Sequence, residues 1–212
     1  MALSIDGEAD FRGMRAGQTH SQLVLRMVDE LLRAHAISLH DLDGIAYGEG
    51  PGSFTGLRIA CGVVQGLAFG ADLRVVGVGT LLAMAVGTGS KRVVCCLDAR
   101  MQEIYHAAYE YDLGSWHVVH PPSVCPPAAA PALNGAGWLG CGSGFVAHAN
   151  VLQTVYAGQL DAIEPDRYPH AREIAQLALP RFRANEAVSS EKAAPLYLRD
   201  KVALRTDERA GR

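Results

Sequence analysis

Apolar and polar positions change period along the chain in a way that predicts an α/β fold. Short β-prone runs bounded by glycine or aspartate predict strands, and apolar residues that recur every three to four positions predict helices. In the first half, the pattern gives the end of a strand at 1–5 entering a turn at 6–7, a helix at 19–36, a strand at 44–47, a helix at 57–69, a strand at 74–78 and a helix at 80–86. Gly70 directly follows the second helix, as is typical of a helix end.

A second unit is predicted to begin near Lys91, which divides the chain into a first lobe at 1–90 and a smaller second lobe at 91–212. Its predicted elements are strands at 92–97, 103–111 and 138–141, the first two antiparallel across a turn at 100–101, and a helix at 172–183. The five prolines of 120–131 predict a polyproline-like surface crossing that is neither helix nor central strand. The charged tail after Val202 is expected to fray.

The composition is that of a folded protein with a sizeable core, because 49% of residues are hydrophobic and 19% are charged. The formal net charge is −3, and the basic residues are scattered. A protein that grips nucleic acid alone normally has a basic face, since phosphate contacts dominate that affinity. We therefore expect any nucleic acid to be held mainly by a partner. Neither a signal peptide nor a bilayer-spanning segment is visible, so we expect a cytoplasmic protein without membrane contact.

The cysteines have no metal-ligand spacing and are odd in number, so reduced thiols are expected instead of a disulfide framework. They are Cys61, Cys95, Cys96, Cys125 and Cys141.

The glycine-rich segment at 48–60 lies between a predicted strand and a predicted helix. Its glycines allow turns that other residues disfavour, and Ser53 or Thr55 can cap the helix. A helix N-terminus can also hold a phosphate, but no lysine follows the glycines as in a P-loop. The residues alone favour a tight strand-to-helix turn over a phosphate cradle.

Two helices carry more apolar surface than a sheet would cover. The apolar residues of 23–32 span an arc of roughly 200°, about twice the width needed to pack on one sheet. In the helix that follows the glycine-rich segment, Gly62, Gly66 and Gly70 recur at spacing four. Glycine inside a helix costs about 1 kcal/mol relative to alanine, so such a row is understandable where another helix comes close. An ordinary buried helix is the alternative.

No catalytic constellation is convincing in the sequence. His117 and His120 would point to opposite faces of a strand, and no His-Glu-x-x-His metal motif is present. Ser53 lacks the Gly-x-Ser-x-Gly context of a hydrolase nucleophile. The run from Asp98 lacks the glycine and hydroxyl residue of a second phosphate loop, which favours a structural or interface role for Asp98 and Arg100. We therefore expect no catalytic residue and no metal site.

The segment GPGSFTGLRIA at 50–60, followed by GVVQGLA, resembles the signature of the TsaB (YeaZ) family. Further matches occur in the expected order, at 20–22, 75–81, 97–105 and 195–199. The resemblance covers essentially the whole chain. It implies a fold of two RNase H-like lobes, as in the actin, Hsp70 and sugar kinase group, with a degenerate nucleotide site. The signature loop comprises Gly50, Pro51, Gly52, Ser53, Phe54, Thr55, Gly56 and Arg58.

The resemblance also implies a non-catalytic role in forming N6-threonylcarbamoyladenosine in tRNA. The chain would support a catalytic relative, TsaD, in a complex joined by the ATPase TsaE, and would self-pair when TsaD is absent. It would bind no cofactor alone, with ATP or ADP conceivable only at the assembled interface. The residues expected to contact the partner are Leu23, Met27, Leu31, Ile59, Gly62, Val63 and Gly66.

Two other classes of function stay open from the residues. One is a minimal actin-like ATPase or kinase with its own turnover, which the unlike phosphate loops disfavour. The other is a peptidase, for which no nucleophile–base pair or metal ligand set is visible.

The beginning of the chain departs from the family pattern. Family members normally start with a strand and an Asp-Thr turn before the hairpin that residues 1–7 enter. That strand would be central, so without it two strands would lack a hydrogen-bonding neighbour. We expect an upstream start codon; intact-mass analysis of the native protein that gave Met1 as the N-terminus would refute this.

Overall fold

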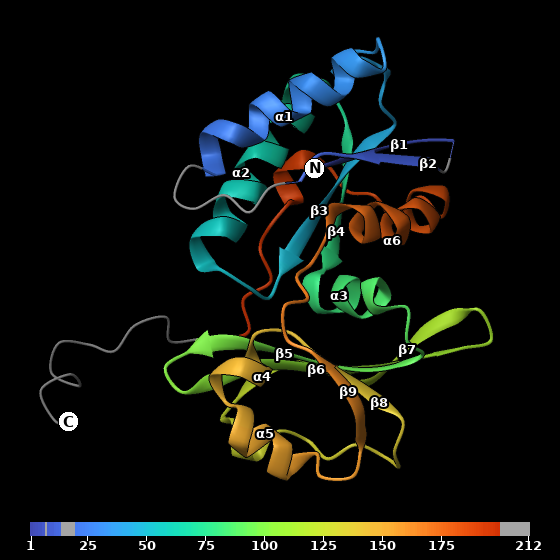
Figure 1. The fold of residues 1–212 in the computed structure, drawn as a ribbon. Coiled ribbons are helices and arrows are strands. Elements are labelled where there is room, and N and C mark those ends of the chain that lie inside the picture. The colour runs from blue at the N-terminus through green and yellow to red at the C-terminus, as the bar shows by residue number, and fades with distance from the viewer. Residues whose placement is uncertain (7, 14–19, 200–212) are drawn as a thin grey trace, which may run out of the picture.

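The computed structural model describes residues 1–6, 8–13 and 20–199, apart from the side chains of residues 20–22. It forms two α/β lobes, with α3 between them (Figure 1). The elements are, in order, β1 (Ala2–Ile5), β2 (Glu8–Phe11), α1 (His20–Ala34), η1 (Leu39–Asp41), β3 (Gly44–Gly50), α2 (Phe54–Gly70), β4 (Arg74–Gly79), α3 (Thr80–Thr88), β5 (Arg92–Arg100), β6 (Glu103–Asp112), β7 (Ser115–Cys125), η2 (Pro127–Ala129), β8 (Trp138–Cys141), α4 (Gly144–Ala147), α5 (Ala149–Val155), β9 (Leu160–Glu164), α6 (Ala171–Arg183) and η3 (Ser190–Lys192).

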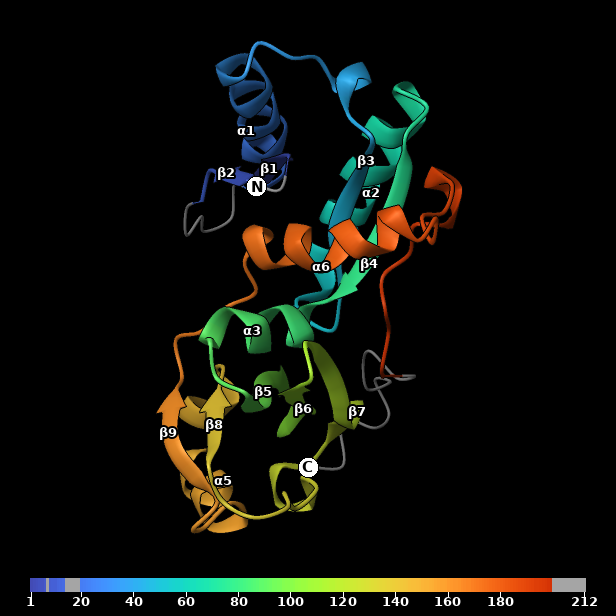
Figure 2. The ribbon, with the colours of Figure 1, turned by 90° about the vertical axis from the view of Figure 1, so that its right-hand side faces the viewer.

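The first lobe is built around a parallel strand–helix–strand unit. Strands β3 and β4 pair in parallel through the crossover helix α2, as expected for a strand–helix–strand order. Successive residues of β4 face opposite sides, so Val75 packs with α2 residues and Val76 with α6 residues. Helices α2 and α6 therefore cover the two faces of this sheet (Figure 2).

Helix α6 brings the chain back to the first lobe. It contacts β3 and β4, with Ile174 and Ala178 in the shared core. The segment 187–199, here called the C-terminal strap, continues along the same lobe and adds a bridge between Val188 and Val75. Residues 171–199, which the sequence division had placed in the second lobe, thus lie mainly against the first.

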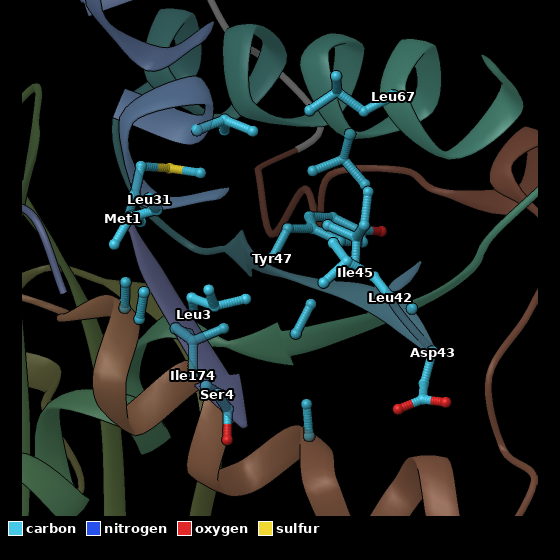
Figure 3. A pocket seen from close by; sticks show the side chains of 18 of the residues that line it. Met1, Leu3, Ser4, Leu31, Leu42, Asp43, Ile45, Tyr47, Leu67 and Ile174 are labelled. Carbon is cyan, nitrogen blue, oxygen red and sulfur yellow. The ribbon is translucent and has the colours of Figure 1, made fainter. Parts of the chain in front are cut away.

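The N-terminal strands form the expected hairpin, but they do not join the β3–β4 sheet. Within the part of the chain that the structure describes, β1 pairs only with β2, and β3 pairs only with β4. An apolar cavity of about 790 Å³ is bounded by β1, β3, α1, α2 and α6. Figure 3 shows Leu3, Leu31 and Ile174 directed into it. Among the described residues, β1 and β3 therefore have one hydrogen-bonded neighbour each.

The second lobe has one continuous five-stranded sheet in the order β7-β6-β5-β8-β9. One face packs against α3 through Leu81 and Met84, and the other packs against α4 and α5. On that second face Trp138, Leu152 and Tyr156 are almost fully buried. The sequence pattern predicted β5, β6 and β8 but not β9, α4 or α5, which are short.

The proline-rich segment corrects the sequence prediction in part. Residues 115–125, including Pro121 and Pro122, form β7 at the edge of the sheet. Proline is tolerated at an edge because one side of the strand needs no N–H donor for a neighbour. Only the remainder, with the short 3-10 turn η2, crosses the surface outside a strand.

In the part of the chain that the structure describes, every helix is too short or too polar to span a bilayer.

Candidate partner interface

The signature loop begins with a buried turn at Gly50 and Pro51, which the rest of the chain holds in place. Pro51 is buried, and its carbonyl accepts a hydrogen bond from the Thr80 hydroxyl. The Glu49 carbonyl accepts from the Leu196 amide at 2.7 Å. Gly50 has φ of +120°, and a Cβ there would lie 3.0 Å from the Leu196 carbonyl oxygen, so a side chain is doubly excluded. This geometry matches the tight turn that the residues favoured.

Ser53 is the residue that caps α2. Its hydroxyl oxygen accepts a hydrogen bond from the Gly56 amide at 3.3 Å. Thr55, the other predicted cap, already lies inside the helix. The helix begins at Phe54, three residues earlier than the apolar period indicated, because the serine cap decides where the first turn starts.

The glycine row of α2 faces outward. A methyl group built at Gly62, Gly66 or Gly70 would meet no atom of another element within 4 Å. Phe69 beside the row is 76% exposed, and the row borders a shallow groove with Ser190 and Glu191. No described element of this chain therefore explains why the row lacks side chains.

The predicted partner-contact residues divide between two sides of the helices. Gly62 and Gly66 lie on the open side. Leu31, in contrast, is only 3% exposed and lines the apolar cavity, and Val63 also lines it. The helical period alone could not separate these sides, since both carry small or apolar residues. The remaining three, Leu23, Met27 and Ile59, are half-buried.

A stack of three side chains stands at the N-terminal end of the glycine row. The Arg58 guanidinium carbon lies 3.4 Å from the centre of the Phe54 ring and 5.5 Å from that of Tyr197. Phe54 and Tyr197 are 38% and 48% exposed. In the sequence, the segment around Tyr197 is marked only by the family resemblance, because a helical period carries no information about a strap that arrives from the far end of the chain.

The strap fastens this region from both lobes. The Tyr47 hydroxyl donates to the Ala194 carbonyl at 3.2 Å, and the Gln65 side chain donates to the Ala193 carbonyl at 2.8 Å. Further along, Arg199 forms an ion pair with Glu103 of the second lobe. The strap therefore spans the two lobes beside the signature loop.

The titratable side chains that were considered as candidate catalytic groups contact other residues of the chain. Asp98 pairs with Arg100 at 3.1 Å and accepts a hydrogen bond from the Arg100 amide. His120 lies against the buried His106, with ring centres 5.8 Å apart, whereas His117 contacts Ser115. Among the described residues no group of three or more His, Cys, Asp or Glu could hold a metal ion.

Burial is the main cause of the pKa shifts of His106, Glu49 and the Cys95 and Cys96 thiols. It lowers the pKa of His106 to about 4, with the nearby His120 adding a smaller effect, and both His106 ring nitrogens lack a hydrogen-bond partner. Burial raises the pKa of Glu49, while Arg181 opposes that shift. Burial also raises the pKa values of the Cys95 and Cys96 thiols, so both stay protonated and unreactive.

Comparisons with known proteins match this architecture along almost the whole chain. The family profile described as "TsaD: tRNA N6-adenosine threonylcarbamoyltransferase" matches residues 13–206. The tRNA threonylcarbamoyladenosine biosynthesis protein TsaB of Escherichia coli is 36% identical, over 96% of this chain and 90% of its own length. The Haemophilus influenzae protein of the same name is 33% identical, over 95% and 89%.

A solved structure gives the same answer for the fold. YeaZ from Pseudomonas aeruginosa superposes with a TM-score of 0.85 at 34% sequence identity, and the match covers 93% of this chain and 92% of that one. Sequence and structure agree, and the α/β fold is that of the RNase H-like, actin-like group. The chain belongs to the TsaB (YeaZ) family of tRNA threonylcarbamoyladenosine biosynthesis proteins.

Proposed function

We propose that this chain is the non-catalytic subunit of the complex that forms N6-threonylcarbamoyladenosine in tRNA. It binds a TsaD-type catalytic subunit through the outward side of α2 and the adjoining part of α1. The single observation that carries the proposal is the open glycine row at Gly62, Gly66 and Gly70.

The row is costly for the isolated chain. Each interior glycine lowers helix stability by about 1 kcal/mol relative to alanine. Nothing in the described part of the chain occupies the space that a side chain would fill. A partner helix that comes close to the α2 backbone supplies the missing reason, because the absence of a side chain permits such an approach.

The non-catalytic role is supported by how the candidate groups are used. Asp98 is paired with Arg100, the segment at 49–56 is tied to Thr80 and Leu196, and the buried thiols are protonated. The isolated chain is accordingly expected to bind no cofactor, and ATP or ADP is expected only at the assembled interface. TsaE completes the complex, tRNA is held mainly by the partners, and the same α2 face permits a homodimer when TsaD is absent.

Substitutions at Gly66 test the proposal without confusing binding with folding. Gly66→Ala should stabilise the isolated chain by up to about 1 kcal/mol, since the added methyl group meets open space. Gly66→Leu should keep the fold but prevent close approach of the TsaD subunit. Affinity is measured by calorimetry and tRNA modification by mass spectrometry of nucleosides, with all subunits present.

Ala147→Leu on α4 is the matched control, because Ala147 is an exposed helical residue of the second lobe. The control should bind the TsaD subunit as the unchanged protein does. Undiminished binding by Gly66→Leu, or adenosine modification by this chain without TsaD, would sink the proposal.

A further inference from the structure

Arg58 continues the glycine row by one helical turn. Arg58, Gly62, Gly66 and Gly70 are spaced by four residues, so they follow one another along a single stripe of α2. A helix that lies on the glycines therefore also passes Arg58. The stripe therefore begins with the positively charged Arg58 side chain and continues with three glycines that have no side chain.

The Arg58 guanidinium is held but not neutralised. Phe54 and Tyr197 contact it through their rings, at 3.4 Å and 5.5 Å from the ring centres. No carboxylate or hydrogen-bond acceptor is found for it among the described residues, and the residue is exposed. The exposed Arg26 and Arg33 of α1 differ, since each pairs with a carboxylate one turn away.

We propose that Arg58 is the anchor point for a carboxylate on the partner helix that packs along the glycine row. This inference rests on the proposed function and names the chemistry that selects the partner. The stacked guanidinium has already lost much of its conformational freedom, so the entropy cost of binding a carboxylate is reduced.

The groove beside Gly62 and Gly66 carries a charge opposite to that of Arg58. Glu191 borders it together with Gly66 and Phe69, and it also has no cationic partner among the described residues. The partner surface that fits is therefore a helix with a carboxylate over Arg58 and a lysine or arginine over Glu191. A tRNA phosphate is disfavoured as the ligand of Arg58, because phosphate binding draws on several cations and this groove presents a carboxylate.

The experiment compares Arg58→Glu with Arg183→Glu in the presence of the TsaD subunit. Arg183 is an exposed arginine of α6, on the other face of the β3–β4 sheet. Arg58→Glu should weaken binding at least about tenfold and flatten its dependence on salt, whereas Arg183→Glu should leave both unchanged. Arg58→Lys keeps the charge but not the planar stack, and should lose about threefold.

The thermal midpoint of each variant is measured first, so that only folded variants are compared. Gly66→Leu then distinguishes failure of the Arg58 inference from failure of the proposed function. Normal binding by Arg58→Glu together with failed binding by Gly66→Leu would overturn this inference and leave the proposed function standing. Normal binding by both would overturn both. Loss of tRNA affinity with unchanged affinity for the TsaD subunit would assign Arg58 to a phosphate and overturn the carboxylate. If replacing an acidic residue of the partner helix by lysine restored binding to Arg58→Glu, that result would support the carboxylate as the ligand of Arg58.

Discussion

The two lobes share an α/β plan but close their cores differently. In the second lobe five strands form one sheet, and Trp138, Leu152 and Tyr156 are almost completely buried against it. In the first lobe two separate pairs of strands border an apolar cavity of about 790 Å³. Unpaired strand edges and missing contacts reduce local stability. We therefore expect the lobe that carries the proposed partner surface to be the less stable one.

Matched leucine deletions should give the largest contrast. Leu152→Ala empties a fully packed site in the second lobe and is expected to cost about 4 kcal/mol of unfolding free energy. Leu31→Ala removes a side chain that already borders the cavity, loses fewer contacts, and should cost about 2 kcal/mol. Urea unfolding measures both values. Equal costs would show that the first lobe is packed as tightly as the second.

Acid should destabilise the second lobe through His106. Burial lowers the pKa of this histidine from 6.5 to about 4 in the folded protein, so the unfolded chain binds the proton more readily. The free energy of unfolding is not reduced by this histidine above pH 6.5, and it falls by about 3 kcal/mol as the pH drops towards 4.

Chemical denaturation at several pH values measures this dependence. His106→Leu should remove most of it, whereas His117→Gln, which changes an exposed histidine, should preserve it. An unchanged pH profile in His106→Leu would exclude His106 as the cause.

Cysteine labelling should sharpen the contrast between the lobes. Cys61 is buried in the first lobe, and Cys95 is buried in the sheet of the second. Because labelling of buried thiols needs local opening, iodoacetamide should modify Cys61 at least about tenfold faster than Cys95. Peptide mass spectrometry follows each site over time. The partly exposed Cys125 serves as an internal control that should react first; equal rates for Cys61 and Cys95 would contradict the contrast.

The smallest effect concerns the cap of α2. Ser53→Ala removes the acceptor for the Gly56 amide and should cost about 1 kcal/mol. Thr55→Ala, at the other hydroxyl residue of this turn, should change stability by less than about 0.5 kcal/mol. Thermal unfolding of both variants checks the assignment, which a larger loss in Thr55→Ala would reverse.

Much of the fold was predictable because local patterns reported it. The apolar run in β5, the β-prone residues of β6, the period in α1 and α2, and the glycines at 50–56 indicated strands, helices and a tight turn. The short elements β9, α4 and α5 escaped prediction, because four to seven residues are too few to establish a period. The sequence indicated the candidate site through the glycine row of α2, but it did not predict that Tyr197 lies beside Arg58 at the end of that row.

The sequence by itself determined the order of the longer helices and of most strands, the turn at the signature loop and the family to which the chain belongs, since local residue patterns carry each of these. Only the tertiary structure decided that Leu31 lines a cavity while Gly62 faces outward, that α6 returns to the first lobe and that Tyr197 stacks on Arg58. The physical reason is that burial and stacking depend on what lies opposite a residue in space. For these residues, that neighbour comes from a segment far away in the chain.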